Sequence, residues 1–181
     1  MARRPRAARS RADVSDMYEL YLIRHGIAEE RGDAWPDDTK RPLTEEGVSR
    51  LRKCARALER LGVSFDVVLT SPLVRTHQTA EAVASAYSPK PPIVNVDALE
   101  PGGSSAAVIA ELEKHAKKTR IALVGHEPGI GELAAKLAGM RLDLEFKKGA
   151  IARIDVEALP PKGPGQLRWF IPPKFLRNLK K

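Results

Sequence analysis

The sequence has almost none of the cysteine that cross-links secreted domains and holds structural zinc. Of its 181 residues only Cys54 is a cysteine, which excludes a disulfide within the chain and any site built on a cysteine pair. A lone thiol is typical of proteins in a reducing compartment, so we expect a cytoplasmic location. The sequence also lacks an apolar run of the roughly 18 residues that a membrane-spanning helix needs, and we expect no contact with a membrane.

Basic residues outnumber acidic ones by 31 to 23, but this excess is unevenly distributed. Residues 1–16 contain five arginines, two aspartates and hardly any large apolar side chain, a composition that predicts a disordered basic tail. An import signal, or a translation start at Met17, would also explain this segment. Without these five positive and two negative charges, the net charge falls from +8 to +5. General basicity is therefore a weak argument for a nucleic-acid partner.

Residues 17–181 are enough for one domain with its own hydrophobic core. Short apolar runs that read as buried strands alternate with amphipathic helical patterns; the runs are 18–23, 66–70, 92–96 and 120–124. Such alternation predicts a three-layer α/β/α sandwich with a mostly parallel central sheet. Residues 149–156 and 166–171 flank a turn rich in proline and glycine, and we expect them to add an antiparallel pair at the sheet edge.

Residues with helix-capping side chains mark the predicted helix boundaries. Thr44 should cap the first helix and Gly62 should end it, and Ser71 should cap a second helix that opens on Pro72. A third helix is expected after Ser104, and a fourth is expected near Pro128.

Histidines and arginines stand where three predicted strands end. Arg24 and His25 follow the first strand, Arg75 lies just after the second, and His126 follows the strand at 120–124. Because the carboxyl ends of parallel strands meet at one edge of a sheet, we expect these four side chains to lie together. Two arginines, two histidines and two helix N-termini suit a tetrahedral dianion, and phosphate is the natural candidate.

A metal site is the rival interpretation of these positions. It is disfavoured because the sequence places no carboxylate or third histidine on this edge at ligand spacing, and because the arginines would repel a cation. We therefore predict neither a metal nor a cofactor.

Three motifs carry a resemblance to a known family. RHG at 24–26, SPLVRTHQTAE at 71–81 and GHEPGIGELA at 125–134 resemble the histidine phosphatase superfamily, and within it the SixA-like phosphohistidine phosphatases. The resemblance implies a phosphoglycerate mutase-like fold and a single histidine phosphatase domain over residues 17–181.

The resemblance also implies roles for the clustered residues. His25 would be the nucleophile that carries the phosphoryl group as a phosphohistidine intermediate. Arg24, Arg75 and His126 would bind the phosphate, with His126 as a protonated donor, and the backbone N–H of Glu127 would be a further donor.

Two departures from the family pattern bear on the substrate. Many members have an acid that protonates an ester leaving group, and here only Asp97 and Glu100 are available, which leaves a role for Glu100 open. Between Thr79 and Arg120 there is no room for a helical cap domain, so the site should be open, with residues 32–40 as its rim.

An open site without a clear acid favours phosphohistidine on a protein as the substrate, with the enzyme working as a monomer. A small phosphate ester is the alternative substrate. A non-catalytic module that binds phosphate or nucleic acid is the third hypothesis.

Overall fold

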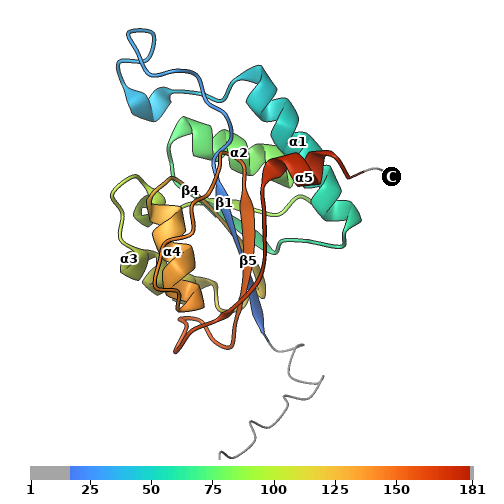
Figure 1. The fold of residues 1–181 in the computed structure, drawn as a ribbon, viewed down its shortest axis with the longest axis vertical. Coiled ribbons are helices and arrows are strands. Elements are labelled where there is room, and N and C mark those ends of the chain that lie inside the picture. Colours follow the sequence, from blue (N-terminus) through green and yellow to red (C-terminus); the bar gives the residue numbers. More distant parts are fainter. Residues whose placement is uncertain (1–16, 180–181) are drawn as a thin grey trace, which may run out of the picture.

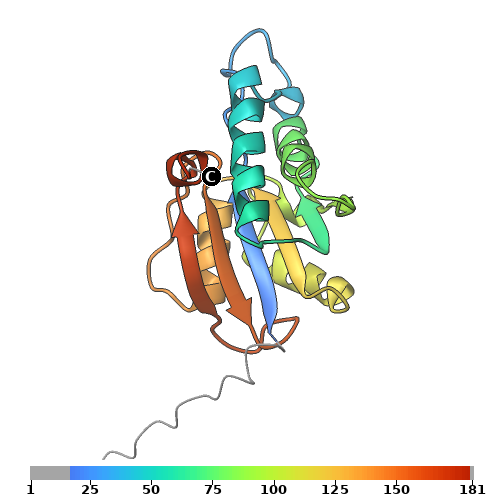
Figure 2. The same ribbon diagram turned by 90° about the vertical axis from the view of Figure 1, so that its right-hand side faces the viewer.

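A six-stranded sheet forms the centre of the fold in the computed structural model, which describes residues 17–179 (Figures 1 and 2). The strands lie in the order β3-β2-β4-β1-β5-β6. Their bounds are Tyr18–Arg24 for β1, Val67–Thr70 for β2, Ile93–Asn95 for β3, Arg120–Gly125 for β4, Ile151–Val156 for β5 and Gln166–Ile171 for β6. The tail predicted over residues 1–16 lies outside the described residues.

Strand pairing agrees with the sequence pattern. The first four strands pair in parallel, β1 with β4, β4 with β2 and β2 with β3. By contrast, β5 pairs antiparallel with β1, and β6 pairs antiparallel with β5 at the sheet edge. The predicted mostly parallel sheet with an added antiparallel pair is confirmed.

Helices cover both faces of the sheet and make three layers. One face packs against α3 (Ser105–Leu112) and α4 (Gly129–Ala138), and the other packs against α1 (Glu45–Arg60), α2 (Val74–Ala84) and α5 (Pro173–Arg177). Side chains alternate along β1, so that Leu20 and Leu22 join the first core and Tyr21 and Ile23 join the second. The three-layer sandwich is confirmed.

No cap domain covers the sheet in the part of the chain that the structure describes. Between α2 and β4 the chain forms only β3, α3 and two short 3-10 helices, η3 (Asp97–Leu99) and η4 (Glu113–His115). A further 3-10 helix, η2 (Asp38–Lys40), lies in the segment that joins β1 to α1. None of the described helices combines the length and the apolar character needed to cross a bilayer.

Most of the predicted helix boundaries are confirmed by hydrogen bonds. The hydroxyl of Thr44 accepts a bond from the N–H of Gly47 at the start of α1 (2.9 Å), and the hydroxyl of Ser104 accepts one at the start of α3. Gly62 follows α1 with a φ of 77°, a conformation that glycine adopts without strain.

The start of α2 is not where the sequence predicted it. The helix begins at Val74, and its N-cap, Leu73, is extended and makes no side-chain capping bond. The predicted cap is wrong: the hydroxyl of Ser71 accepts from the N–H of Leu73 (3.4 Å), ahead of the helix, and lies 3.0 Å from Nε2 of His126, the residue that follows β4. The late start places Arg75 in the first turn of α2, at the edge of the sheet where the strands end.

Candidate active site

The carboxyl ends of β1, β2 and β4 meet at one edge of the sheet. Arg24, the last residue of β1, lies opposite Gly125 of β4 in the parallel ladder. The N–H of His25 donates to the carbonyl of Gly125 (3.0 Å), and the N–H of Ser71 donates to the carbonyl of Val124 (3.1 Å). Three neighbouring strands therefore deliver their following residues to the same place. In Figure 1 the segment between β1 and α1, in light blue, rises above this edge.

His25 is buried, with 7% of its surface exposed. Its Nδ1 lies 2.8 Å from the carbonyl oxygen of Gly26, so Nδ1 carries the proton and donates it, which leaves the lone pair of Nε2 free. Burial lowers the pKa of His25 to about 4, and the charges of Arg75 and Arg24 act in the same direction. The ring is therefore neutral near pH 7, as a nucleophile requires.

His126 lies beside His25, with a ring-centroid separation of 5.2 Å. Burial lowers its pKa to about 3, with further contributions from His25 and Arg75. The ring of the protein alone is thus neutral near pH 7, and the protonated donor that the resemblance implies would need the charge of a bound phosphate. A phosphate dianion beside the ring would raise its pKa, because a nearby negative charge favours the protonated form.

Both arginines are fixed by contacts to the loops around the site. Arg24 donates from Nη1 to the carbonyl of Phe146. Arg75 is 2% exposed; its Nη1 donates to the backbone carbonyl of Asp38 (2.8 Å), and its Nη2 lies 3.1 Å from the Asp38 carboxylate. Each guanidinium is therefore held in a set orientation.

Three buried nitrogen atoms in this cluster have no hydrogen-bond partner among the described residues: Nε of Arg24, Nε of Arg75 and Nδ1 of His126. Buried polar groups normally have partners, so such a group indicates a ligand or a catalytic role. A tetrahedral oxyanion offers acceptors that match both guanidinium groups.

Asp38 is the residue of this site that the sequence did not predict. The sequence assigned its segment only to the rim of the site, but η2 brings Asp38 against Arg75. Partial burial alone would raise the pKa of Asp38, but hydrogen bonds from Arg41 and Arg31 and the charge of Arg75 lower it to about 2. Asp38 is thus a carboxylate near pH 7; it orients Arg75 and has no proton to give.

No group of three or more histidine, cysteine or acidic side chains is placed to hold a metal ion in the described part of the chain. The Asp38 carboxylate is already shared among three arginines, Arg31, Arg41 and Arg75. These contacts pair the Asp38 carboxylate with arginines and hold Arg75 in place.

Glu127 acts through its side chain, in a way that the sequence did not suggest. Its carboxylate accepts a hydrogen bond from the N–H of Phe146, the residue whose carbonyl binds Arg24. Burial raises the pKa of Glu127. Glu127 and Arg24 together hold the loop before β5 against the end of β4.

Two further residues, Thr79 and Glu100, lie close to the clustered histidines and arginines. The hydroxyl of Thr79 accepts from the N–H of Gly26 (3.1 Å) and donates to the carbonyl of Arg75 (2.7 Å), which ties the loop after β1 to α2. Glu100 and His126 both line a cavity of about 210 Å³ beside α3 and α4. Glu100 is thus a neighbour of His126, while Arg75 and His25 are not among the residues that line this cavity.

Comparison with known proteins identifies relatives of this chain. Residues 20–100 match the family model described as the histidine phosphatase superfamily (branch 1). The chain is 29% identical to phosphohistidine phosphatase SixA of Escherichia coli over 164 residues, which cover 90% of this chain and 98% of that protein. It is 44% identical over 123 residues to an uncharacterised protein of Picosynechococcus, covering 66% of this chain and 73% of the relative.

A solved structure shares the fold over most of the chain. The structure of the protein histidine phosphatase SixA complexed with tungstate superposes with a TM-score of 0.78 and 27% sequence identity. The superposition covers 87% of this chain and 99% of that one. The likeness therefore extends well beyond the three motifs, to nearly the whole of the described fold.

Proposed function

The chain is a phosphatase that belongs to the histidine phosphatase superfamily, within its SixA-like group, and we propose that it removes phosphate from phosphohistidine in a protein substrate. The observation that carries the proposal is the state of His25. This histidine is neutral, its Nδ1 is fixed by the Gly26 carbonyl, and it stands in a cluster with Arg24, Arg75 and His126. The relationship to SixA, a phosphohistidine phosphatase, supports the substrate class.

In the proposed first step, Nε2 of His25 attacks the phosphorus atom. A nitrogen–phosphorus bond forms on His25 while the bond to the substrate imidazole breaks, and its electron pair stays on the departing nitrogen. In the second step a water molecule attacks the phosphorus, the bond to Nε2 breaks, and inorganic phosphate leaves. Two moderate displacements thus replace one difficult reaction.

Arg24, Arg75 and His126 would bind the phosphoryl oxygens through their unpartnered nitrogen atoms. For phosphoryl transfer, positioning and charge stabilisation supply most of the catalysis, which suits fixed guanidinium groups. The tungstate bound by the SixA structure is a tetrahedral oxyanion like phosphate, and it supports this assignment. The backbone N–H of Glu127 is the further donor that we propose.

The leaving group favours phosphohistidine over an ester. Asp38, the carboxylate that binds Arg75, has a pKa of about 2 and cannot protonate a leaving oxygen near pH 7. An imidazole leaves more readily without a dedicated acid, because the second ring nitrogen of a phosphohistidine can take up a proton from solvent before the bond to phosphorus breaks, so that a neutral imidazole departs. The uncapped fold also leaves room for a phosphate presented on a protein surface.

A small phosphate ester is the second candidate substrate, and one observation favours it. Glu100 and His126 line the same cavity, which would put a carboxyl group near a phosphate bound by His126. If esters are the substrate, Glu100→Gln should lower ester hydrolysis and leave phosphohistidine hydrolysis unchanged. The relationship to phosphatases argues against a non-catalytic module.

The proposal also covers the cellular compartment and the oligomeric state of the enzyme. Cys54 is a free, buried thiol whose pKa burial raises to about 11, so it is unreactive, and we place the enzyme in the reducing cytoplasm. We propose the monomer as the working form.

The test is a panel of phosphodonors. Phosphate release should be measured from a phosphotransfer domain labelled on histidine, from a phosphoserine peptide and from para-nitrophenyl phosphate. We expect the largest kcat/KM for phosphohistidine, and a rate at background for His25→Ala with every donor. A kcat/KM that is larger for an ester than for phosphohistidine would contradict the proposed substrate.

A further inference from the structure

A groove lies beside the reaction centre, separate from the cavity that Glu100 and His126 line. Its volume is about 580 Å³. It is lined by residues of the loop after β1, of α1, of the loop before β5 and of α5. Figure 1 shows α1 and α5 next to each other on this side of the molecule. Arg24 is part of its wall, so the groove adjoins the site described above.

The groove is tied to the site by backbone contacts and by charge. The N–H of Gly149, in the groove wall, lies 3.1 Å from the carbonyl oxygens of both Arg24 and His25. The charge of Lys148, another groove residue, contributes to the lowered pKa of His25. The groove therefore adjoins the backbone segment that carries His25.

The groove combines an apolar floor with a basic rim. Leu51, Pro173 and Phe175 are among its apolar residues, and Phe175 is 67% exposed. Its charged residues are all basic: Arg24, Arg50, Lys147, Lys148, Lys174 and Arg177. Such a lining fits an amphipathic ligand of negative charge.

Most of this positive charge has no counter-charge within the fold. Arg50 pairs with Glu46 across one turn of α1. Lys147, Lys148 and Lys174, like Arg177, form no ion pair with any residue in the described range 17–179. Uncompensated charge on one wall raises the local concentration of a ligand of opposite sign.

We propose that this groove binds an acidic segment of the protein substrate, next to its phosphohistidine, with an apolar side chain of that segment on the floor. The proposal rests on the proposed function and names the feature by which the enzyme selects its protein. A second copy of this chain is a poorer match, because the chain carries a net charge of +8. A small polyanion would leave the apolar floor exposed.

The test uses two peptides that differ only in charge. Each carries a non-hydrolysable phosphonate analogue of phosphohistidine beside one leucine, and the glutamates of the first are glutamines in the second. Binding is measured by fluorescence anisotropy, so the result does not depend on hydrolysis. We expect the acidic peptide to bind about tenfold more tightly at low salt, because exposed charge pairs are individually weak but add, and we expect the difference to shrink at high salt.

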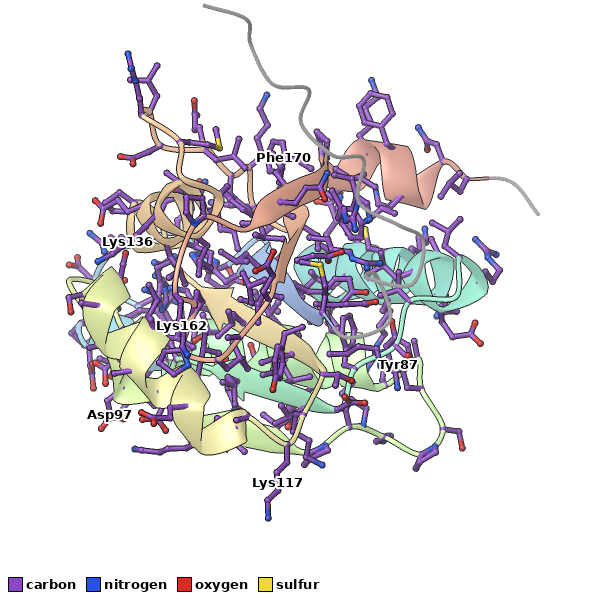
Figure 3. All side chains as sticks on the ribbon, turned by 90° about the horizontal axis from the view of Figure 1, so that it is seen from below. Tyr87, Asp97, Lys117, Lys136, Lys162 and Phe170 are labelled. Carbon is purple, nitrogen blue, oxygen red and sulfur yellow. The ribbon has the colours of Figure 1, made fainter. Side chains whose placement is uncertain are left out.

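A pair of charge-reversed variants separates the groove from general charge. Lys147→Glu with Lys174→Glu should abolish the preference for the acidic peptide. Lys117→Glu with Lys136→Glu changes the net charge equally and should retain it, since these exposed lysines lie outside the groove. Figure 3, a view from below, shows Lys117 extending away from the fold.

Several outcomes would overturn the proposal. Equal binding of both peptides by the wild type would do so, as would an equal loss of preference in the two variant pairs. A dimer that dissociates only in the groove variant would assign the groove to a second copy. Selective binding of phosphatidylserine vesicles, with no preference between the peptides, would assign it to an anionic surface. Hydrolysis of the matching phosphohistidine peptides is measured separately, and its absence would count against the proposed function alone.

Discussion

Lowering the pH from 7.5 to 5 should leave His25 neutral, and this is the most specific consequence of its surroundings. With a pKa of about 4, about nine-tenths of the rings remain neutral at pH 5, against about 3% for a histidine at the usual value of about 6.5. The proton should also stay on Nδ1, because the Gly26 carbonyl accepts it at 2.8 Å. Nε2 should therefore keep its lone pair throughout this range.

The assay is a pH series of histidine ring ¹⁵N correlation spectra, with His25→Gln to identify the signals. We expect one protonated and one unprotonated ring nitrogen for His25, with no change between pH 7.5 and 5. A titration midpoint close to 6.5, or a proton on Nε2, would refute the argument that burial and the neighbouring arginines prepare this ring for attack.

The same shifts predict how stability depends on pH. His25 and His126 have lower pKa values in the folded protein than in the unfolded chain, so the unfolded chain binds more protons below pH 6.5. Their contribution is present above pH 6.5 and is lost as the pH falls toward 4. The free energy of unfolding should fall by at most about 1.4 kcal/mol per pH unit for each histidine. Urea unfolding at pH 7 and pH 5 measures this, and a smaller slope is expected for His126→Asn.

Two substitutions test residues that hold the elements around the site in place. Asp38→Asn removes the carboxylate that holds Arg75, so kcat/KM should fall and the Kd for inorganic phosphate should rise, each by about tenfold, since hydrogen bonds between charged groups are worth about 1.5–3 kcal/mol. Asp33→Asn, which changes an exposed carboxylate of the same segment, is the matched control, and an equal effect of both would contradict the role of Asp38. Gly47→Ala would place a Cβ 2.2 Å from a backbone carbonyl oxygen and should destabilise the fold by about 1–3 kcal/mol in urea unfolding. Gly129→Ala, which meets nothing within 4 Å, should cost far less.

Much of the fold follows from local patterns in the sequence. The strands are short apolar runs, and the cap at Thr44 and the glycine at 62 act within a few residues of the helix they bound. The gathering of His25 and His126 at one edge follows from parallel topology, which needs only the order of the elements.

Features that depend on contacts across the fold could not be predicted in this way. Ser71 has the sequence position of a helix cap, but its hydroxyl lies within hydrogen-bond distance of His126, which follows β4. Asp38 reaches Arg75 from a loop whose path no periodicity specifies. The neutral state of His126 reflects burial among positive charges, which is a property of the assembled site.

The covalent intermediate gives the most direct test of the account. The protein is mixed briefly with ³²P-labelled phosphoramidate, quenched in alkali and analysed by peptide mapping. We predict one labelled peptide with an acid-labile, alkali-stable phosphate on His25, and no label in His25→Gln. Label on another residue, or turnover of the donor without any labelled enzyme at the shortest times, would contradict the assignment of His25 as the phosphoryl acceptor.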